Sequence, residues 1–114
     1  GGNFPLWLMP EQAIILSLSE KYEKYSQKVL TLLENNEIRA LIDNRNETVG
    51  KKIREAEVQK FPYMLIVGEQ EEKDGTVSVR KHSEGDLGSM SIEDFTNLIN
   101  KEIKSTLKPF KTEV

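Results

Sequence analysis

The feature that most constrains the fold is an alternation of short apolar runs with longer amphipathic segments. Four runs have the length and composition of strands: Gln12–Leu18, Ile38–Ile42, Tyr63–Val67 and Thr76–Arg80. Tyr63–Val67 is apolar throughout, which is typical of a buried strand. Thr76–Arg80 alternates polar and apolar residues, which favours an antiparallel strand near a sheet edge. This pattern predicts an open sheet covered by helices.

Helices are predicted between and after these strands. The first follows Ser19, a good N-cap residue, and carries Tyr22 and Tyr25 on its apolar face, so we expect both tyrosines in the core. The last begins after Ser91, which has an acidic residue three positions on as in a capping box, and runs to about Ile103.

A further helix is predicted from about Thr48 to Lys60. Its inward residues include Ile53 and Ala56, and its basic residues, Lys52 among them, are expected to project away from that stripe.

The order of elements and the short connections predict parallel pairing of the first three strands and an antiparallel fourth. Glu69–Asp74 is expected to be a charged turn leading into a hairpin at Asp74-Gly75. Gly85 and Gly88 are expected to interrupt regular structure. The predicted fold class is α/β, a three-layer α/β/α arrangement with a mixed, mainly parallel central sheet.

Composition narrows the kinds of protein that the chain can be. Its 114 residues suffice for one domain, and the absence of cysteine excludes disulfides and thiolate chemistry. No apolar run approaches the ~20 residues of a membrane span. The formal net charge of −3 argues against nonspecific nucleic-acid binding, which normally requires a basic balance. The start without an initiator methionine suggests a piece of a longer protein.

The motifs of several enzyme classes are missing. Gly50-Lys51-Lys52 looks like the end of a phosphate-binding loop, but Arg45 stands where that motif needs glycine and Lys52 where it needs Ser or Thr. No dinucleotide fingerprint occurs. The only histidine, His82, has no sequence-local partner for a triad or metal site and is expected to be solvated.

The segment from Asp43 to Arg54 concentrates Asn, Arg and Lys just beyond the carboxyl end of a predicted parallel strand. Open α/β sheets bind ligands at that edge, and these side chains can grip phosphates or read base edges. Its acidic residues nearly balance the basic ones, and spacing alone favours an ion-paired helix surface. Both interpretations remain open on this evidence.

Four blocks of the chain carry a family resemblance: Phe4-Pro5-Leu6-Trp7-Leu8-Met9-Pro10-Glu11-Gln12, Asp43-Asn44-Arg45-Asn46-Glu47-Thr48-Val49-Gly50-Lys51-Lys52-Ile53-Arg54-Glu55, Phe61-Pro62-Tyr63-Met64-Leu65-Ile66-Val67-Gly68, and Val77-Ser78-Val79-Arg80 with Asp86-Leu87-Gly88-Ser89-Met90. In order and spacing they resemble the C-terminal anticodon-binding domain of threonyl-tRNA synthetases, which are class IIa enzymes. The chain departs from the family pattern at Met9, where Ala is usual, and at Lys51, where an aromatic residue is common.

The resemblance implies a module that performs no chemistry itself and reads the G-U end of threonine anticodons. The family's anticodon-contacting positions fall on Asn46, Arg54, Glu71 and Arg80. Further candidates for phosphate contacts are Arg45, Lys51 and Lys52. A carboxylate at Glu71 can accept from the paired donors of guanine, and the Asn46 amide matches the mixed edge of uracil.

The resemblance also implies the setting of the domain. Residues 1–10 would form a lead-in from an upstream catalytic domain, 11–107 the anticodon-binding domain and 108–114 a frayed tail. Its partner would be the anticodon stem-loop of threonine tRNA, with no DNA and no membrane involved. The parent enzyme would be a cytoplasmic homodimer that uses ATP, Mg²⁺ and Zn²⁺ upstream, with no cofactor or metal in this part. Two alternatives stay open: the equivalent domain of another class II synthetase, and a protein-interaction module on the same fold.

Overall fold

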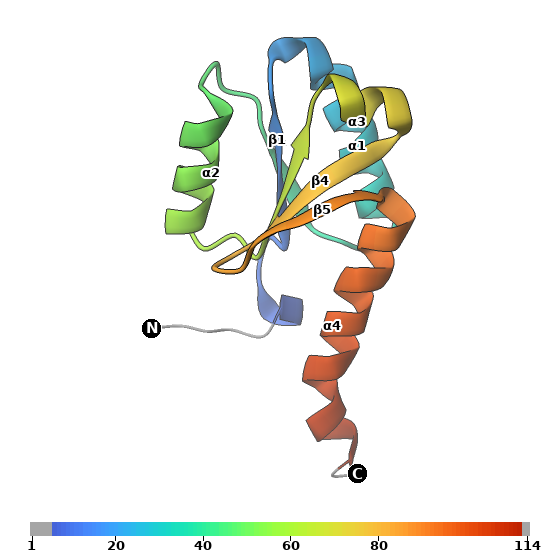
Figure 1. Cartoon of the computed structure of the whole chain (residues 1–114). Coiled ribbons are helices and arrows are strands. Elements are labelled where there is room, and N and C mark those ends of the chain that lie inside the picture. Colours follow the sequence, from blue (N-terminus) through green and yellow to red (C-terminus); the bar gives the residue numbers. More distant parts are fainter. Residues whose placement is uncertain (1–5, 113–114) are drawn as a thin grey trace.

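The computed structural model describes residues 6–112 of the chain (Figure 1). The lead-in predicted for residues 1–10 and the tail predicted for residues 108–114 therefore lie partly outside the described residues. Within residues 6–112 the strands are β1 (Ala13–Ser17), β2 (Ala40–Asp43), β3 (Tyr63–Val67), β4 (Thr76–Lys81) and β5 (Gly85–Ser91). The α-helices of the same range are α1 (Glu23–Asn35), α2 (Val49–Val58), α3 (Glu69–Asp74) and α4 (Ile92–Thr112), and 3₁₀ turns are η1 (Leu6–Leu8) and η2 (Glu20–Tyr22).

The strands form one mixed sheet in the order β2-β1-β3-β4-β5. β1 runs parallel to both neighbours and places Ile15 opposite Ile42 on β2 and Leu65 on β3. β4 is antiparallel to β3 and to β5. Helices α1 and α4 lie on one face of the sheet and α2 on the other, which gives three layers (Figure 1). The predicted α/β class with a mixed sheet and helices on both faces is confirmed.

β5 was not predicted from the sequence, and its pairing with β4 divides the sheet evenly between parallel and antiparallel pairs. The sheet is therefore mixed as predicted, but it is not mainly parallel. The glycines that were expected to interrupt regular structure lie within β5 instead. Gly85 has φ +84° and Gly88 has φ +91°, a region that glycine enters without steric cost. The register shifts opposite Val79 and Arg80, which face Gly88 and Asp86, so the extra residue of this bulge lies on β5.

Residues 69–74 form the short helix α3, where the sequence analysis expected a turn. Gly68 begins the helix, and its backbone N–H donates to Glu71 Oε1 at 2.8 Å, so the acidic side chain caps the first turn. Gly75 ends the helix in the left-handed conformation, with φ +71°. The Asp74-Gly75 signal therefore marks the end of a helix.

The main hydrophobic core lies between the sheet and the pair α1 and α4. Its largest buried side chains include Tyr63 and Phe95, whose rings pack edge to face with centroids 5.4 Å apart. Tyr25 is buried and Tyr22 packs against the core, as predicted. Leu6 of the lead-in also belongs to this core. A smaller cluster under α2 includes Ala56 and Met64.

A polar cluster joins α4 to the sheet. The hydroxyl of Tyr63 on β3 donates to the Glu102 carboxylate, and Lys81 Nζ of β4 lies 3.2 Å from Glu102 Oε1. Because Tyr63 is also part of the main core, this cluster fixes the position of α4 on the sheet.

Candidate nucleic-acid interface

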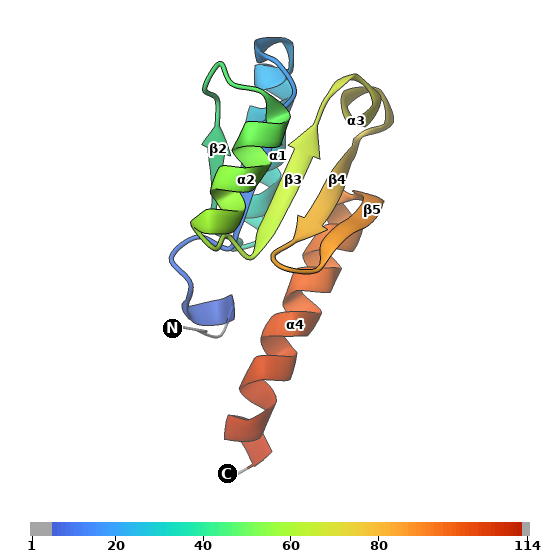
Figure 2. The same cartoon turned by 60° about the vertical axis from the view of Figure 1, so that its left-hand side comes forward.

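One half of the sheet is open on the side that carries α2. Figure 2 shows α2 in front of the β2–β1–β3 half, while β4 and β5 run past it uncovered. Alternation along β4 turns Val77 and Val79 into the main core and therefore turns Ser78 and Arg80 to the open side. The open side thus carries polar side chains.

Glu71 is held rigidly beside this open face. Its Oε1 accepts from the Gly68 backbone N–H at 2.8 Å, and its Oε2 accepts from Ser78 Oγ at 3.1 Å. A carboxylate has about four lone-pair positions, so both oxygens keep acceptor capacity for a ligand. Ser78 Oγ also lies 3.2 Å from Ser89 Oγ of β5, which extends the polar row across the two strands.

Arg80 lies two residues beyond Ser78 on the same face of β4. Its Nε is buried and, among the residues that the structure describes, has no hydrogen-bond partner. Buried donors are normally paired, and an exception indicates a missing partner such as a ligand or water. Arg80 therefore offers an Nε donor two residues beyond Ser78, the β4 residue that contacts the fixed Glu71 carboxylate of α3.

The other two predicted base contacts lie on the α2 side of the sheet. Asn46 is exposed in the loop between β2 and α2, at the carboxyl edge of the parallel strands. Arg54 is exposed on α2. A methyl group built on Gly50 would lie 3.9 Å from Arg54 Nη1, so the guanidinium reaches back towards the first turn of the helix. The structure thus places Glu71 against Ser78, two residues before Arg80 on β4. Asn46 lies in the loop that precedes α2, and Arg54 lies on α2.

Two of the three predicted phosphate contacts are engaged by neighbouring carboxylates. Arg45 Nε and Nη2 each lie 2.9 Å from an oxygen of Asp43, and Nη2 also donates to Glu55 Oε1. The hydrogen bond from Arg45 lowers the pKa of Asp43, and the bond to Asp43 raises the pKa of Arg45. Lys51 Nζ lies 3.2 Å from Glu47 Oε2. The ion-paired helix surface considered in the sequence analysis is therefore present.

Lys52 does not project away from the inward face of α2, as the sequence analysis expected. It is 2% exposed, and its Nζ donates to the backbone oxygens of Ser17 and Asp43, both at 3.2 Å. Helical spacing contained the signal, because position 52 lies beside Val49 and Ile53 on one face. Its buried ammonium ties α2 to the carboxyl ends of β1 and β2.

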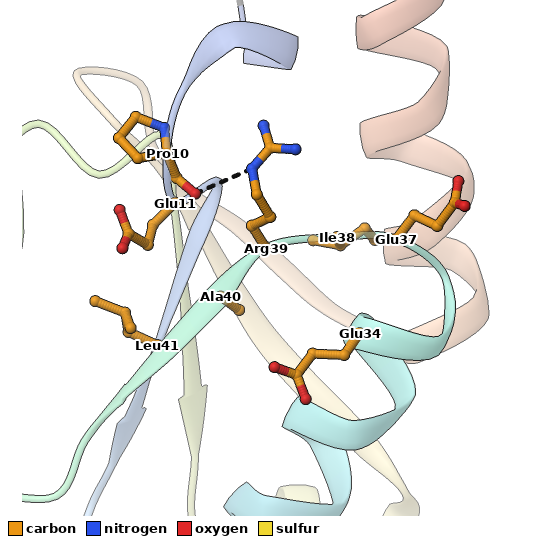
Figure 3. Close-up of a pocket in the computed structure, with 8 residues that line it drawn as sticks. All are labelled: Pro10, Glu11, Glu34, Glu37, Ile38, Arg39, Ala40 and Leu41. Atoms are coloured by element: carbon orange, nitrogen blue, oxygen red, sulfur yellow. Dashed lines mark hydrogen bonds between the residues drawn. The ribbon is translucent and has the colours of Figure 1, made fainter.

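A hollow of about 570 Å³ lies at the opposite edge of the sheet, near the start of β2 (Figure 3). Its lining includes three carboxylates, those of Glu11, Glu34 and Glu37. Its one guanidinium, Arg39, donates to the backbone oxygens of Met9 and Pro10. This excess of negative charge disfavours phosphate, so the hollow is no part of the candidate interface.

Within residues 6–112 no group of three or more His, Cys, Asp or Glu side chains is arranged to hold a metal ion. None of the helices described in the structure combines the length and apolar character needed to cross a bilayer. His82 is only half exposed and lies with Nδ1 2.8 Å from Glu57 Oε1, so it is less solvated than predicted.

The described residues combine an open sheet face, a fixed carboxylate and a guanidinium Nε without a partner, features that are typical of a ligand-binding α/β domain. The family model described as "Anticodon binding domain" matches residues 12–102, and the chain belongs to this family. The resemblance seen in the sequence is thereby confirmed.

Three relatives support the same conclusion. The chain is 70% identical over 111 residues to the threonine–tRNA ligase of Flavobacterium johnsoniae, covering 96% of this chain and 17% of that protein. The threonine–tRNA ligase of Bacteroides fragilis is 52% identical over 106 residues, covering 93% and 16%. The RNA binding domain of threonyl-tRNA synthetase from Cryptosporidium parvum superposes with a TM-score of 0.82 at 31% identity, over 89% of this chain and 26% of that one. The chain thus spans about a sixth of the length of the curated relatives.

Proposed function

We propose that this chain reads the anticodon loop of threonine tRNA as the recognition domain of a threonine–tRNA ligase. Two observations support the proposal, in a chain of the anticodon-binding family. The Glu71 carboxylate is fixed against Ser78 on the uncovered side of the sheet, and Arg80 follows two residues later on the same strand with an Nε that lacks a partner among the described residues. The high identity to threonine–tRNA ligases supports threonine as the amino acid of the parent enzyme.

Each residue has a role in this proposal. Glu71 accepts from N1–H and the amino group of guanine, a pair of donors that no other base offers, and Arg80 donates to guanine or stacks on a base. Asn46 pairs with the donor and acceptor of uracil, and Arg54 positions a base or a phosphate. Lys51 remains a candidate phosphate contact. The ion pairs of Arg45 with carboxylates and the burial of Lys52 favour another role for these two residues.

The same proposal covers the position of this domain in a longer parent enzyme. Residues 1–10 join it to an upstream catalytic domain, residues 11–107 form the domain and 108–114 a tail, although the burial of Leu6 means that the lead-in also packs on it. The parent is a homodimeric cytoplasmic enzyme that joins threonine to tRNA, using ATP and Mg²⁺ with a Zn²⁺ ion in its catalytic part.

The test is binding of the chain to the anticodon stem-loop of threonine tRNA, at low and moderate salt. The comparison is the same hairpin with the G and U at the end of the anticodon replaced. We expect preference for the cognate hairpin, and we expect Arg80→Ala or Asn46→Ala to lose about 5- to 150-fold in affinity, the equivalent of about 1–3 kcal/mol per base contact. Lys101→Ala on the opposite face is the charge-matched control and should bind as the unchanged chain does.

The outcomes separate the alternatives. Equal binding of both hairpins indicates a tRNA-backbone module, and a different preferred anticodon indicates another class II synthetase. No salt-dependent binding favours the protein-interaction module, for which the acidic net charge is the supporting observation. Replacing the guanine by inosine, which lacks the amino group, should weaken the unchanged chain more than Glu71→Gln. Equal losses would remove the Glu71 assignment.

A further inference from the structure

Two basic side chains, the half-exposed Arg45 and the buried Lys52, fix the loop between β2 and α2 through contacts within the protein. The Arg45 guanidinium grips the Asp43 carboxylate with two hydrogen bonds of 2.9 Å and reaches Glu55 on α2 with a third. Asp43 Oδ1 also accepts from the Arg45 backbone N–H at 3.2 Å. Arg45 therefore bridges the end of the strand, the loop and the helix.

Lys52 of α2 also holds the end of β2, from the buried side of the helix. Its buried ammonium donates to the backbone oxygen of Asp43 and to that of Ser17 at the end of β1. Asp43 is thus held through its main chain by Lys52 and through its side chain by Arg45. A buried ammonium with these partners is not available to an external phosphate.

Asn46 directly follows Arg45 in this fastened loop. The Glu47 N–H donates to the Arg45 carbonyl at 2.9 Å, and Thr48 caps α2 by accepting from the Lys51 N–H at 3.2 Å. Asn46 itself is exposed, and its amide group takes no part in the hydrogen bonds that fix this loop within the described part of the chain. The loop is therefore fixed around a side chain that is left free.

We propose that Asp43, Arg45, Lys52 and Glu55 form a positioning clamp that presents the Asn46 amide to the anticodon base, and that Arg45 and Lys52 do not bind phosphate. This inference rests on the proposed function. Its physical basis is preorganisation, because a side chain on an already ordered loop loses less entropy when it binds.

The clamp and simple electrostatics predict opposite changes in RNA affinity for the variant Glu55→Gln. Removing a carboxylate from a surface that faces RNA reduces repulsion and should strengthen binding. If Glu55 instead holds Arg45, Glu55→Gln loosens the loop and weakens binding. The charge change is the same under both hypotheses, so the sign of the effect decides between them.

The experiment measures binding of the full 114-residue chain to the cognate hairpin and to the hairpin with a replaced U. Glu55→Gln should weaken cognate binding by roughly 2- to 12-fold, the equivalent of ordering one side chain. Glu34→Gln, at the far edge of the sheet, is the matched loss of one negative charge and should not weaken binding. Combining Glu55→Gln with Asn46→Ala should give no more loss than Asn46→Ala alone, since both act through the same contact.

Variants of Arg45 test the clamp independently. Their result holds even if Glu55→Gln does not fold normally. Arg45→Lys keeps the charge but cannot make the two-pronged contact, so the clamp predicts a loss similar to that of Arg45→Gln. Neither variant should change the slope of log affinity against log salt. Tighter or unchanged binding of Glu55→Gln would overturn the inference, as would a salt slope reduced by about 0.7 in Arg45→Gln, the signature of one lost phosphate contact on a single strand. If the unchanged chain does not distinguish the two hairpins, the proposed function fails first and the clamp with it.

Discussion

The hydrogen bond from Tyr63 to Glu102 gives a stability prediction that can be followed with pH. Tyr63→Phe removes only the hydroxyl and keeps the edge-to-face packing on Phe95. A hydrogen bond to a charged group contributes about 1.5–3 kcal/mol, and Glu102 retains Lys81 as a partner. We therefore expect a loss of about 1.5 kcal/mol at pH 7, the lower end of that range, because Glu102 is partly exposed.

The alkaline limb of the stability curve makes the test specific. Burial, followed by the hydrogen bond and charge of Glu102, raises the pKa of Tyr63 in the folded chain far above its ordinary value of 10.0. The unfolded tyrosine ionises above pH 10 while the folded one stays neutral, so the stability that Tyr63 contributes is complete below pH 10 and is lost as pH rises beyond it. At pH 11 one such tyrosine costs the folded state about 1.4 kcal/mol.

The assay is urea unfolding of both proteins at pH 8 and pH 11. The difference in unfolding free energy between the unchanged chain and Tyr63→Phe should shrink by about 1.4 kcal/mol between the two pH values. Tyr25→Phe is the comparison for the free energy lost when a buried hydroxyl is removed. Burial also raises the pKa of Tyr25, but its hydroxyl donates to a neutral acceptor, the backbone carbonyl of Thr76. Its cost at pH 7 should be about 1 kcal/mol. A difference for Tyr63→Phe that stays constant or widens with pH would refute the reasoning.

Three further predictions concern stability. Phe95→Ala empties a fully buried site and should cost about 3–5 kcal/mol in urea unfolding, whereas Val58→Ala at an exposed position should change stability by less than about 0.5 kcal/mol. Arg45 lowers the pKa of Asp43, so the stability that this contact contributes is present above about pH 4 and is lost as pH falls further. In Asp43→Asn the free energy of unfolding should therefore fall less steeply at acid pH. Gly75→Ala introduces a side chain at φ +71° with no neighbouring atom within 4 Å, so strain alone should cost about 1 kcal/mol by thermal unfolding, and no loss would contradict the left-handed assignment.

Strong, uninterrupted patterns allowed most of the fold to be predicted. Tyr63–Val67 was bounded correctly because an apolar run between Pro62 and Gly68 leaves little freedom in its ends. β5 could not be predicted from local signals, since Gly85 and Gly88 normally favour turns and the strand depends on its pairing with β4. The tertiary contact overrides the local preference there.

The candidate interface was likewise predictable in part from the sequence. The residue types were visible in the sequence, and the predicted alternation along Thr76–Arg80 agrees with the shared face of Ser78 and Arg80 on β4. The inward direction of Lys52 was misread because a lysine was assumed to face solvent, although long basic side chains can bury their stems and find carbonyl partners. The partners of Glu71 could not be foreseen, because its capping contact exists only once residues 69–74 are helical.

The ion pairs around α2 bear on how an acidic domain would recognise RNA in the proposed function. Asp43, Glu55 and Glu47 neutralise most of the positive charge of this region by pairing with Arg45 and Lys51. A surface neutralised in this way gives little counterion release and hence little nonspecific affinity. The side chains left to bind are few and directional, and each can form hydrogen bonds with a base edge. If the chain has the proposed function, its binding energy is concentrated in contacts that differ between bases, so that a domain with net charge −3 selects an anticodon without retaining every RNA that it meets.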